Sequence, residues 1–236
     1  MGKCNKTKKK AYFKPYELVF WIASLLIIAL AFLIFDRKSP LSLLASLVGV
    51  SSLVFNSKGN PLGQALIIVF SVFYGIISFE ARYFGEMITY IGMSLPMAVI
   101  ALISWIRNPF EKGKSEVKIN EISRREVILA LIASLFVTVA FYFILSYLGT
   151  ANLIVSTLSV TTSFTAAYFT ARRSSLFALF YAFNDLVLIV LWTVEAFRDS
   201  SAICVVICFL AFLVLDLYTF VAWRRMAKRQ NGACES

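Results

Sequence analysis

The sequence predicts an all-α polytopic membrane protein with eight transmembrane helices. Hydrophobic residues occupy 60% of its 236 positions and gather in eight apolar stretches. Seven of these approach the roughly twenty residues that cross about 30 Å of hydrocarbon. Lys and Arg lie almost entirely between the stretches. The predicted spans are 18–35, 41–55, 62–79, 87–106, 127–148, 151–169, 176–197 and 202–223.

Three of the spans need separate arguments. The basic segment 1–17 precedes the first span, and no small-residue cleavage site follows that span, so we interpret it as a retained helix and not as a signal peptide. The second stretch, 41–55, is short, and it crosses only if its polar flanks extend it at the interfaces. The fourth span contains Pro96, which removes a backbone donor and should kink the helix.

The distribution of charge favours eight crossings. If the amino terminus is cytoplasmic and every stretch crosses, nineteen of the 23 Lys and Arg lie on the cytoplasmic side, where such residues accumulate because they resist translocation. The other four are Arg37, Lys38, Arg82 and Arg198. Without the second span, the basic loop 107–125 would lie on the opposite side from the basic amino terminus. We therefore expect both termini on the cytoplasmic side.

Composition excludes several classes of function. The net charge of +10 needs no nucleic-acid partner, because it orients the chain in the bilayer and attracts anionic lipid head groups. The chain has no His, which excludes Ser-His-Asp and Cys-His nucleophiles and the HExxH zinc site. It has no glycine-rich phosphate loop, and its Cys residues lack metal-ligand spacing. We expect no catalytic residue, no metal and no cofactor, hence no enzyme.

The two halves of the chain resemble each other. A shift of 118 residues places Trp105 on Trp223 and Arg107 on Arg225, and it brings spans two to four close to spans six to eight. Chance alignment of two hydrophobic triplets is the alternative, but the paired Trp-x-Arg ends favour a true parallel repeat, a layout typical of transporters. We expect the last residues, 231–236, to be free polar chain.

The predicted organisation has seven parts. They are a basic cytoplasmic amino terminus, an extra transmembrane helix, a three-helix repeat, a cytoplasmic loop, a linker helix, a second three-helix repeat and a cytoplasmic tail, at 1–17, 18–35, 41–106, 107–125, 127–148, 151–223 and 224–236.

The seventh span carries an aromatic face with one amide in it. At 100° per residue, positions three and four apart trace one side of a helix. Here they hold Phe177, Phe180, Tyr181, Asn184 and Trp192. Aromatic walls around an amide suit a flat heterocycle that stacks and hydrogen-bonds. The alternative is an aromatic stripe that packs against a neighbouring helix, with the amide as an interhelical hydrogen-bonding group.

Further candidate substrate-binding residues lie on the eighth and third spans. Asp216 is an intramembrane carboxyl group, which is costly to bury and normally faces a cavity or a partner, and Tyr218 lies two residues beyond it. On the third span, Gln64 and Tyr74 belong to a polar series at nearly helical spacing. Asn60 has two interpretations, a substrate ligand or, with the proline that follows it, the cap of a helix.

These residues resemble the PnuC family of vitamin transporters. The seventh span matches the family's pattern of a basic pair, two aromatic residues three apart, an Asn and a Trp, in Arg172, Arg173, Phe177, Phe180, Asn184 and Trp192. The rest of the two repeats adds Tyr74, Gly75, Glu86, Pro96, Trp105 and Trp223. The resemblance covers nearly the whole chain beyond Leu41. It implies a SWEET-like arrangement of three, one and three helices, here with an extra amino-terminal span.

The resemblance also implies a function. The family implies facilitated diffusion of nicotinamide riboside, a form of vitamin B3, by alternating access through a bacterial inner membrane, with trapping by intracellular phosphorylation. This chain departs from the family in having Phe177 and Phe180 where Trp is usual. A deoxynucleoside or thiamine carrier, or a membrane scaffold that transports nothing, is therefore the alternative. The oligomeric state, a homo-oligomer included, is left open.

Overall fold

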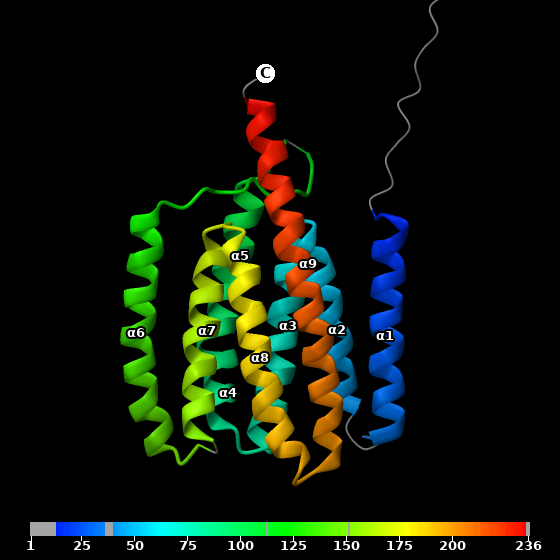
Figure 1. Cartoon of the computed structure of the whole chain (residues 1–236), viewed down its shortest axis with the longest axis vertical. Helices are drawn as coiled ribbons and strands as arrows, with labels where there is room; N and C mark the ends of the chain where they lie inside the picture. The colour runs from blue at the N-terminus through cyan, green and yellow to red at the C-terminus, as the bar shows by residue number, and fades with distance from the viewer. Residues whose placement is uncertain (1–12, 36–39, 112, 151, 235–236) are drawn as a thin grey trace, which may run out of the picture.

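The computed structural model describes residues 13–35, 40–111, 113–150 and 152–234. Within these ranges, eight helical segments are long and apolar enough to cross a membrane, and they stand side by side in one bundle (Figure 1). The prediction of an all-α protein with eight membrane-spanning helices is confirmed. The helices are α1 Pro15–Phe35, α2 Pro40–Ser57, α3 Pro61–Glu80, α4 Phe84–Ile88, η1 Thr89–Ser94, α5 Leu95–Arg107, α6 Arg124–Tyr147, α7 Leu153–Ala171, α8 Leu176–Ala196, η2 Ser200–Ala202 and α9 Ile203–Cys234.

The short second stretch forms a full helix because its polar residues are satisfied within it. α2 is eighteen residues long. The hydroxyl of Ser46 donates to the carbonyl of Ser42, and that of Ser52 donates to the carbonyl of Gly49 at 2.6 Å. Ser57 bonds back to Val54 in the same way. Hydroxyls that bond to the preceding turn leave no polar group for lipid to solvate, so the helix continues across the bilayer.

The eighth span is longer than predicted at its carboxyl end. The expectation of free polar chain over 231–236 is wrong for the described part, because α9 continues as a helix to Cys234. The side-chain amide of Asn231 donates to Oε1 of Glu121 at 2.6 Å. The segment between α5 and α6 therefore binds the last turns of α9, a contact between distant parts of the chain that composition does not reveal.

The fourth span changes its winding just before Pro96. It consists of α4, the π-helical turn η1 and α5 in succession. Proline has no N–H to donate, and its ring crowds the carbonyl four residues earlier, so the chain winds more widely there. Tyr90 and Ser94 of η1 are thereby turned toward the centre of the bundle, where both line a cavity. Such π-helical turns are frequent at functional sites.

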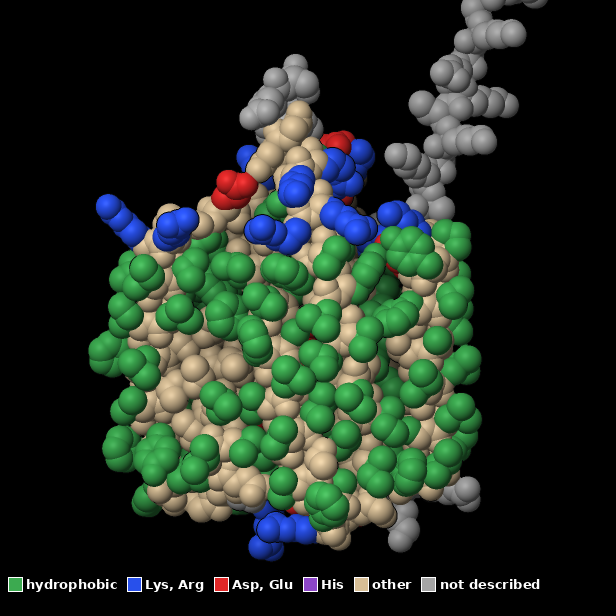
Figure 2. Space-filling model, viewed as in Figure 1, with side chains coloured by type: hydrophobic (Ala, Val, Ile, Leu, Met, Phe, Trp, Pro, Cys, Tyr) green, Lys and Arg blue, Asp and Glu red, His purple; other side chains and the backbone are tan. Residues whose placement is uncertain are grey.

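Basic side chains gather at one end of the bundle. Figure 2 shows an apolar band with Lys and Arg concentrated at the end where α9 stops and α1 begins. We call this end the basic face. At the other end, the opposite face, the basic residues within the described ranges are Arg82 and Arg198. α1 and α6 lie at the two edges of the bundle (Figure 1) and expose large apolar side chains, as expected for helices that face lipid.

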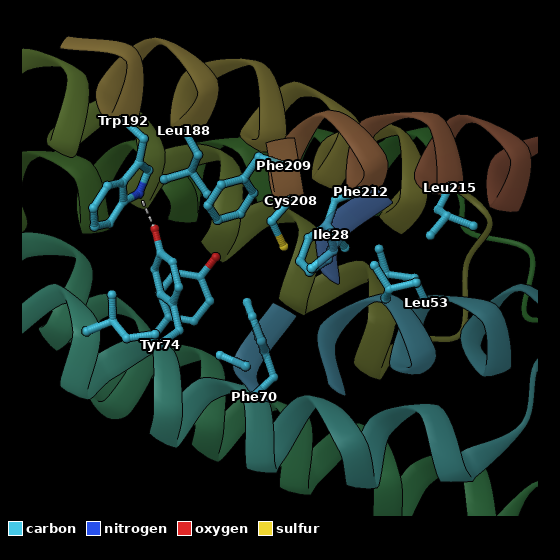
Figure 3. Close-up of a cluster of buried hydrophobic side chains, with 14 of the residues drawn as sticks. Ile28, Leu53, Phe70, Tyr74, Leu188, Trp192, Cys208, Phe209, Phe212 and Leu215 are labelled. Carbon is cyan, nitrogen blue, oxygen red and sulfur yellow. Dashed lines mark hydrogen bonds between the residues drawn. The ribbon is translucent and has the colours of Figure 1, made fainter. Parts of the chain in front are cut away.

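The inner helices meet closely around the centre. α2 packs on α3 and α9, while α8 packs on α7 and α9. Gly49 of α2 permits this approach, because a Cβ atom there would lie only 2.3 Å from Cζ of Phe212 on α9 and 3.0 Å from Cδ2 of Phe70 on α3. Figure 3 shows the buried cluster in which these two aromatic side chains lie.

Candidate functional site

A small polar cavity lies at the centre of the bundle, among α2, α3, η1, α7, α8 and α9. Its volume is about 40 Å³, enough for a few water molecules and far below the roughly 300 Å³ of a typical ligand pocket. No Lys or Arg of the described residues lines it. The lining residues are Leu53, Asn56, Gln64, Ile67, Phe70, Ser71, Tyr90, Ser94, Ser163, Tyr181, Asn184, Asp185, Phe212 and Asp216.

Asn184 is oriented by three hydroxyl groups of α7. Its Oδ1 lies 2.8 Å from the hydroxyl of Thr162 and 2.9 Å from that of Ser163. Ser159 is a third, longer contact at 3.4 Å. These hydroxyls occupy one end of the Asn184 amide group, which leaves the other end for a group in the cavity. The amide is therefore fixed before any ligand arrives, which lowers the entropy lost on binding.

A hydrogen-bonded pair of amide side chains faces Asn184 from the other half of the chain. Nε2 of Gln64 on α3 donates to Oδ1 of Asn56 on α2 at 2.9 Å, and both side chains are buried. Gly63 makes room for this pair, because a Cβ atom there would lie 2.2 Å from Oδ1 of Asn56. Gln64 retains its carbonyl oxygen as an acceptor for a ligand donor.

Two carboxyl groups meet in the cavity. Asp185 of α8 and Asp216 of α9 are 3% and 2% exposed, and both line the cavity. Among the described residues, Oδ2 of Asp185 and Oδ1 of Asp216 have no hydrogen-bond partner. Buried oxygens of this kind are costly to leave unpaired, so they mark a position for a ligand donor or cation.

An aromatic group closes the cavity toward the opposite face. The ring of Tyr90, a cavity residue, lies 4.3 Å between centroids from that of Tyr74 on α3. Nε1 of Trp192 on α8 donates to the hydroxyl of Tyr74 (Figure 3), and Phe209 meets Tyr74 edge-on at 5.5 Å. Trp192 also lines an open hollow of about 890 Å³ at the opposite face. Trp192 and Tyr74 therefore stand between this hollow and the central cavity.

A second aromatic group closes the cavity toward the basic face. The rings of Trp105 on α5 and Trp223 on α9 lie 5.2 Å apart, and Phe177 on α8 lies 4.8 Å from Trp223. Nε1 of Trp223 donates to the carbonyl oxygen of Asn56 at 2.8 Å. The ring of Tyr181, a cavity residue, lies 6.2 Å from that of Phe177. Phe177 thus belongs to this closure and not to the cavity lining.

Replacement of Phe177 by Trp should destabilise the protein. Phe177 is fully buried between two indole rings, and an added ring in a filled site forces neighbours out of place at about 1–3 kcal/mol. Phe180→Trp is the matched control, because Phe180 is only partly buried. Thermal unfolding in detergent measures the difference. Equal unfolding temperatures for the two variants would show that the Phe177 site has spare room.

The predicted substrate-binding residues separate into three groups. Asn184, Tyr181, Gln64 and Asp216 line the cavity, whereas Tyr74, Trp192 and Phe177 belong to the two aromatic closures. The third group lies elsewhere. Phe180 stacks on Phe169 at 5.4 Å, Asn60 caps α3 by accepting a hydrogen bond from the N–H of Leu62, and Tyr218 donates to Glu17 near the basic face.

Four cavity residues are not among the candidates predicted from the sequence: Asp185, Asn56, Tyr90 and Phe70. Asp185 had a usable signal, since it is an acidic residue within a span and adjoins Asn184. Asn56 also had one, as a polar residue at the end of a short apolar stretch. Nothing in the local pattern distinguishes Tyr90 or Phe70 from ordinary packing residues.

The bundle and its cavity together define a class of protein. Eight membrane-spanning helices form the bundle, and six of them line a buried polar cavity near its middle, with an aromatic closure on either side. This is the architecture of a membrane transporter. The chain belongs to the Nicotinamide mononucleotide transporter family, whose sequence profile matches residues 39–225. α1 precedes the matched range.

Two known proteins are similar to this chain, one in sequence and one in fold. The chain is similar to the Nicotinamide riboside transporter PnuC of Neisseria mucosa, with 24% identity over 218 residues that cover 90% of this chain and 82% of the relative. Its fold is that of the protein in the crystal structure of the Vitamin B3 transporter PnuC. That match has a TM-score of 0.83 and 21% identity, and it covers 92% of this chain and 94% of the other. The resemblance to the PnuC family and the expectation that the chain is not an enzyme are confirmed.

Proposed function

We propose that this protein carries nicotinamide riboside across a bacterial inner membrane by facilitated diffusion. The observation that supports this choice is the lining of the central cavity, which has two carboxyl groups and no Lys or Arg of the described residues. Nicotinamide riboside has a positively charged pyridinium ring and no phosphate, so it complements the carboxyl pair of Asp185 and Asp216. Nicotinamide mononucleotide adds a phosphate, which would face the same carboxyl groups without a Lys or Arg of the described residues to pair with.

The cavity residues suggest a role for each part of this substrate. The fixed amide of Asn184 is placed to hydrogen-bond the carboxamide or a ribose hydroxyl, and Gln64 offers an acceptor from the facing helix. Phe70 and Tyr90 provide aromatic surfaces on which the flat pyridinium ring can stack. Ionisation of Asp185 or Asp216 would supply the compensating charge that a cation needs in a medium of low dielectric.

The two aromatic closures support alternating access. Tyr74 and Trp192 are 118 residues apart, as are Trp105 and Trp223, and each pair is in contact. Residues related by a two-fold axis can touch only near that axis. The two contacts therefore support two parallel repeats, α2 to α5 and α7 to α9, around an axis through the cavity. Opening one closure at a time would expose the cavity, now too small for a nucleoside, to one side of the membrane.

The sidedness of the bundle fits this function. The basic face carries most of the described Lys and Arg, so we place it and both chain termini on the cytoplasmic side. Substrate released there would be trapped by intracellular phosphorylation, because the cavity that passes nicotinamide riboside is unsuited to its phosphate. Transport then requires neither an ATPase nor a coupled ion.

Uptake into proteoliposomes tests the choice of substrate. We expect the initial rate for nicotinamide riboside to exceed that for nicotinamide mononucleotide at least about tenfold, the factor that a cost of 1.4 kcal/mol for the unpaired phosphate produces. Thiamine and deoxynucleosides are the comparison substrates. Equal uptake of the two nicotinamide compounds would contradict the proposed substrate, and faster uptake of thiamine or a deoxynucleoside would replace it. Transport of none of them would favour a scaffold.

A further inference from the structure

A second, larger cavity opens at the basic face between α1, α9 and the carboxyl end of α2. Its volume is about 370 Å³, within the range of small-molecule sites. It is separate from the central cavity and shares no lining residue with it. The charged side chains around it are Lys14, Glu17, Lys58, Glu116, Arg225 and Arg229.

The two carboxylates of this cavity already have partners. Glu17 is 7% exposed, and its Oε2 lies 2.5 Å from Nζ of Lys58 while its Oε1 accepts from the hydroxyl of Tyr218 at 2.6 Å. Glu116 forms an ion pair with Arg229. Both oxygens of the buried Glu17 are therefore satisfied, and each carboxylate neutralises one cation.

Two cations of the same cavity have no carboxylate partner among the described residues. Arg225 of α9 is exposed and makes no salt bridge. Nζ of Lys14, just before α1, lies 5.6 Å from the centroid of the Tyr16 ring. The four basic and two acidic side chains give the cavity a net charge of about +2, so it favours an anion that brings two negative charges or several acceptor oxygens.

The position of the cavity narrows the chemistry of that anion. The apolar band of the bundle meets the basic side chains at this end (Figure 2), and the cavity is lined by residues of both kinds. Part of its wall is apolar, from Val221, Ala222 and Met226 of α9. Phosphate groups match such a site, because guanidinium and ammonium donors bind their oxygens strongly. A phosphate there would connect Lys14, Lys58 and Arg225, which belong to three separate segments of the chain.

We propose that this cavity binds a phosphate group, carried either by an anionic phospholipid head group or by a soluble phosphate compound, and that the bound phosphate holds α1 and α9 against the end of α2. Phosphate binding at this site does not depend on the substrate of the central cavity. It is the edge helix α1, with its Glu17 anchor, that completes one wall of it.

Thermal unfolding of the full chain in a neutral detergent tests the site. The anionic lipid dioctanoyl phosphatidylglycerol is compared with dioctanoyl phosphatidylcholine, whose phosphate is neutralised by its choline group. Adenosine 5′-monophosphate and inorganic phosphate are compared with adenosine. A ligand that binds only the folded state stabilises it by RT ln(1 + [L]/Kd), so the unfolding temperature rises with the ligand concentration and the affinity. Stabilisation by phosphatidylglycerol alone assigns the site to lipid, by the soluble phosphates alone to a soluble compound, and by both to the shared phosphate chemistry.

Neighbouring arginines provide matched variants. Arg225→Gln should weaken the apparent affinity for the stabilising ligand about fivefold, the effect of one basic residue near an anionic head group, and Lys14→Gln should act in the same direction. Arg224→Gln, which removes the same charge one position away and outside the cavity, should change little. Equal weakening by Arg224→Gln and Arg225→Gln, or no stabilisation by any phosphate ligand, overturns the proposal. Binding of nicotinamide riboside should be unchanged in all three variants, which separates this site from the central one.

Discussion

Replacement of Asn184 by Leu is expected to weaken binding of nicotinamide riboside about 100-fold while the protein still folds. Leu has nearly the shape of Asn but neither donates nor accepts a hydrogen bond. A substrate group that loses its partner in a buried site costs about 1–3 kcal/mol, and sites built around hydrogen bonds depend on them strongly. The change also removes the partner of the Ser163 hydroxyl, so a small loss of stability is expected as well.

Two measurements separate binding from folding for this variant. Ligand-induced thermal stabilisation reports affinity, and the unfolding temperature without ligand reports the fold. Phe183→Leu is the matched control, because Phe183 adjoins Asn184 on α8 but is half exposed on the outside of the bundle. If Asn184→Leu folds and binds as well as Phe183→Leu does, Asn184 is only an interhelical contact and the substrate lies elsewhere.

The fold could be predicted from the sequence because hydropathy and charge report the surroundings of a segment and not its partners. All eight spans were located, and the grouping of basic residues at one end of the bundle was anticipated. The carboxyl end of α9 was not. Its last turns are polar and are fixed by contacts with Glu116 and Glu121, more than 100 residues away in the sequence, and no local pattern encodes such pairs.

The sequence predicted which face of α8 carries the candidate site, but not how much of that face lines the cavity. Periodicity along α8 identified the face that carries Asn184, but it cannot say how much of that face meets the cavity. Phe177 and Trp192 lie seven and eight residues from Asn184, which is about 10–12 Å along a helix. That distance places them in the closures above and below the cavity. Residues of one helical face thus line the cavity and form part of the closure on each side of it.

Asp185 is a cavity residue that the periodicity of α8 does not identify. It lies about 100° around α8 from Asn184, so the aromatic face does not include it. It reaches the cavity because α9 packs on that side of α8 and brings Asp216 to it. The partner of a buried carboxyl group is a property of helix packing. A single sequence shows that such a group is costly, but not which group shares the cost.

Conversion of both carboxyl groups to amides, Asp185→Asn with Asp216→Asn, should reduce the affinity for nicotinamide riboside about 100-fold and raise thermal stability. Opposite unit charges about 5 Å apart attract by roughly 3 kcal/mol at an effective dielectric of 20, which corresponds to that change in affinity. Stability should rise because an amide is cheaper to bury than a carboxyl pair with unpartnered oxygens. The same variant should lose its preference for nicotinamide riboside over nicotinamide mononucleotide, since the repulsion of the phosphate disappears with the carboxyl groups.

The opposite signs of these two effects distinguish a functional pair from a structural one, because loss of a structural contact would lower stability and affinity together. Glu86→Gln is the matched control. Glu86 is fully buried, both of its carboxyl oxygens lack a hydrogen-bond partner within the described part of the chain, and it does not line the cavity. The Glu86→Gln variant should therefore have a higher stability and an unchanged affinity for nicotinamide riboside. If the double variant binds the riboside within threefold of the wild type, the carboxyl pair does not balance the pyridinium charge, and the preference for the unphosphorylated compound must have another source.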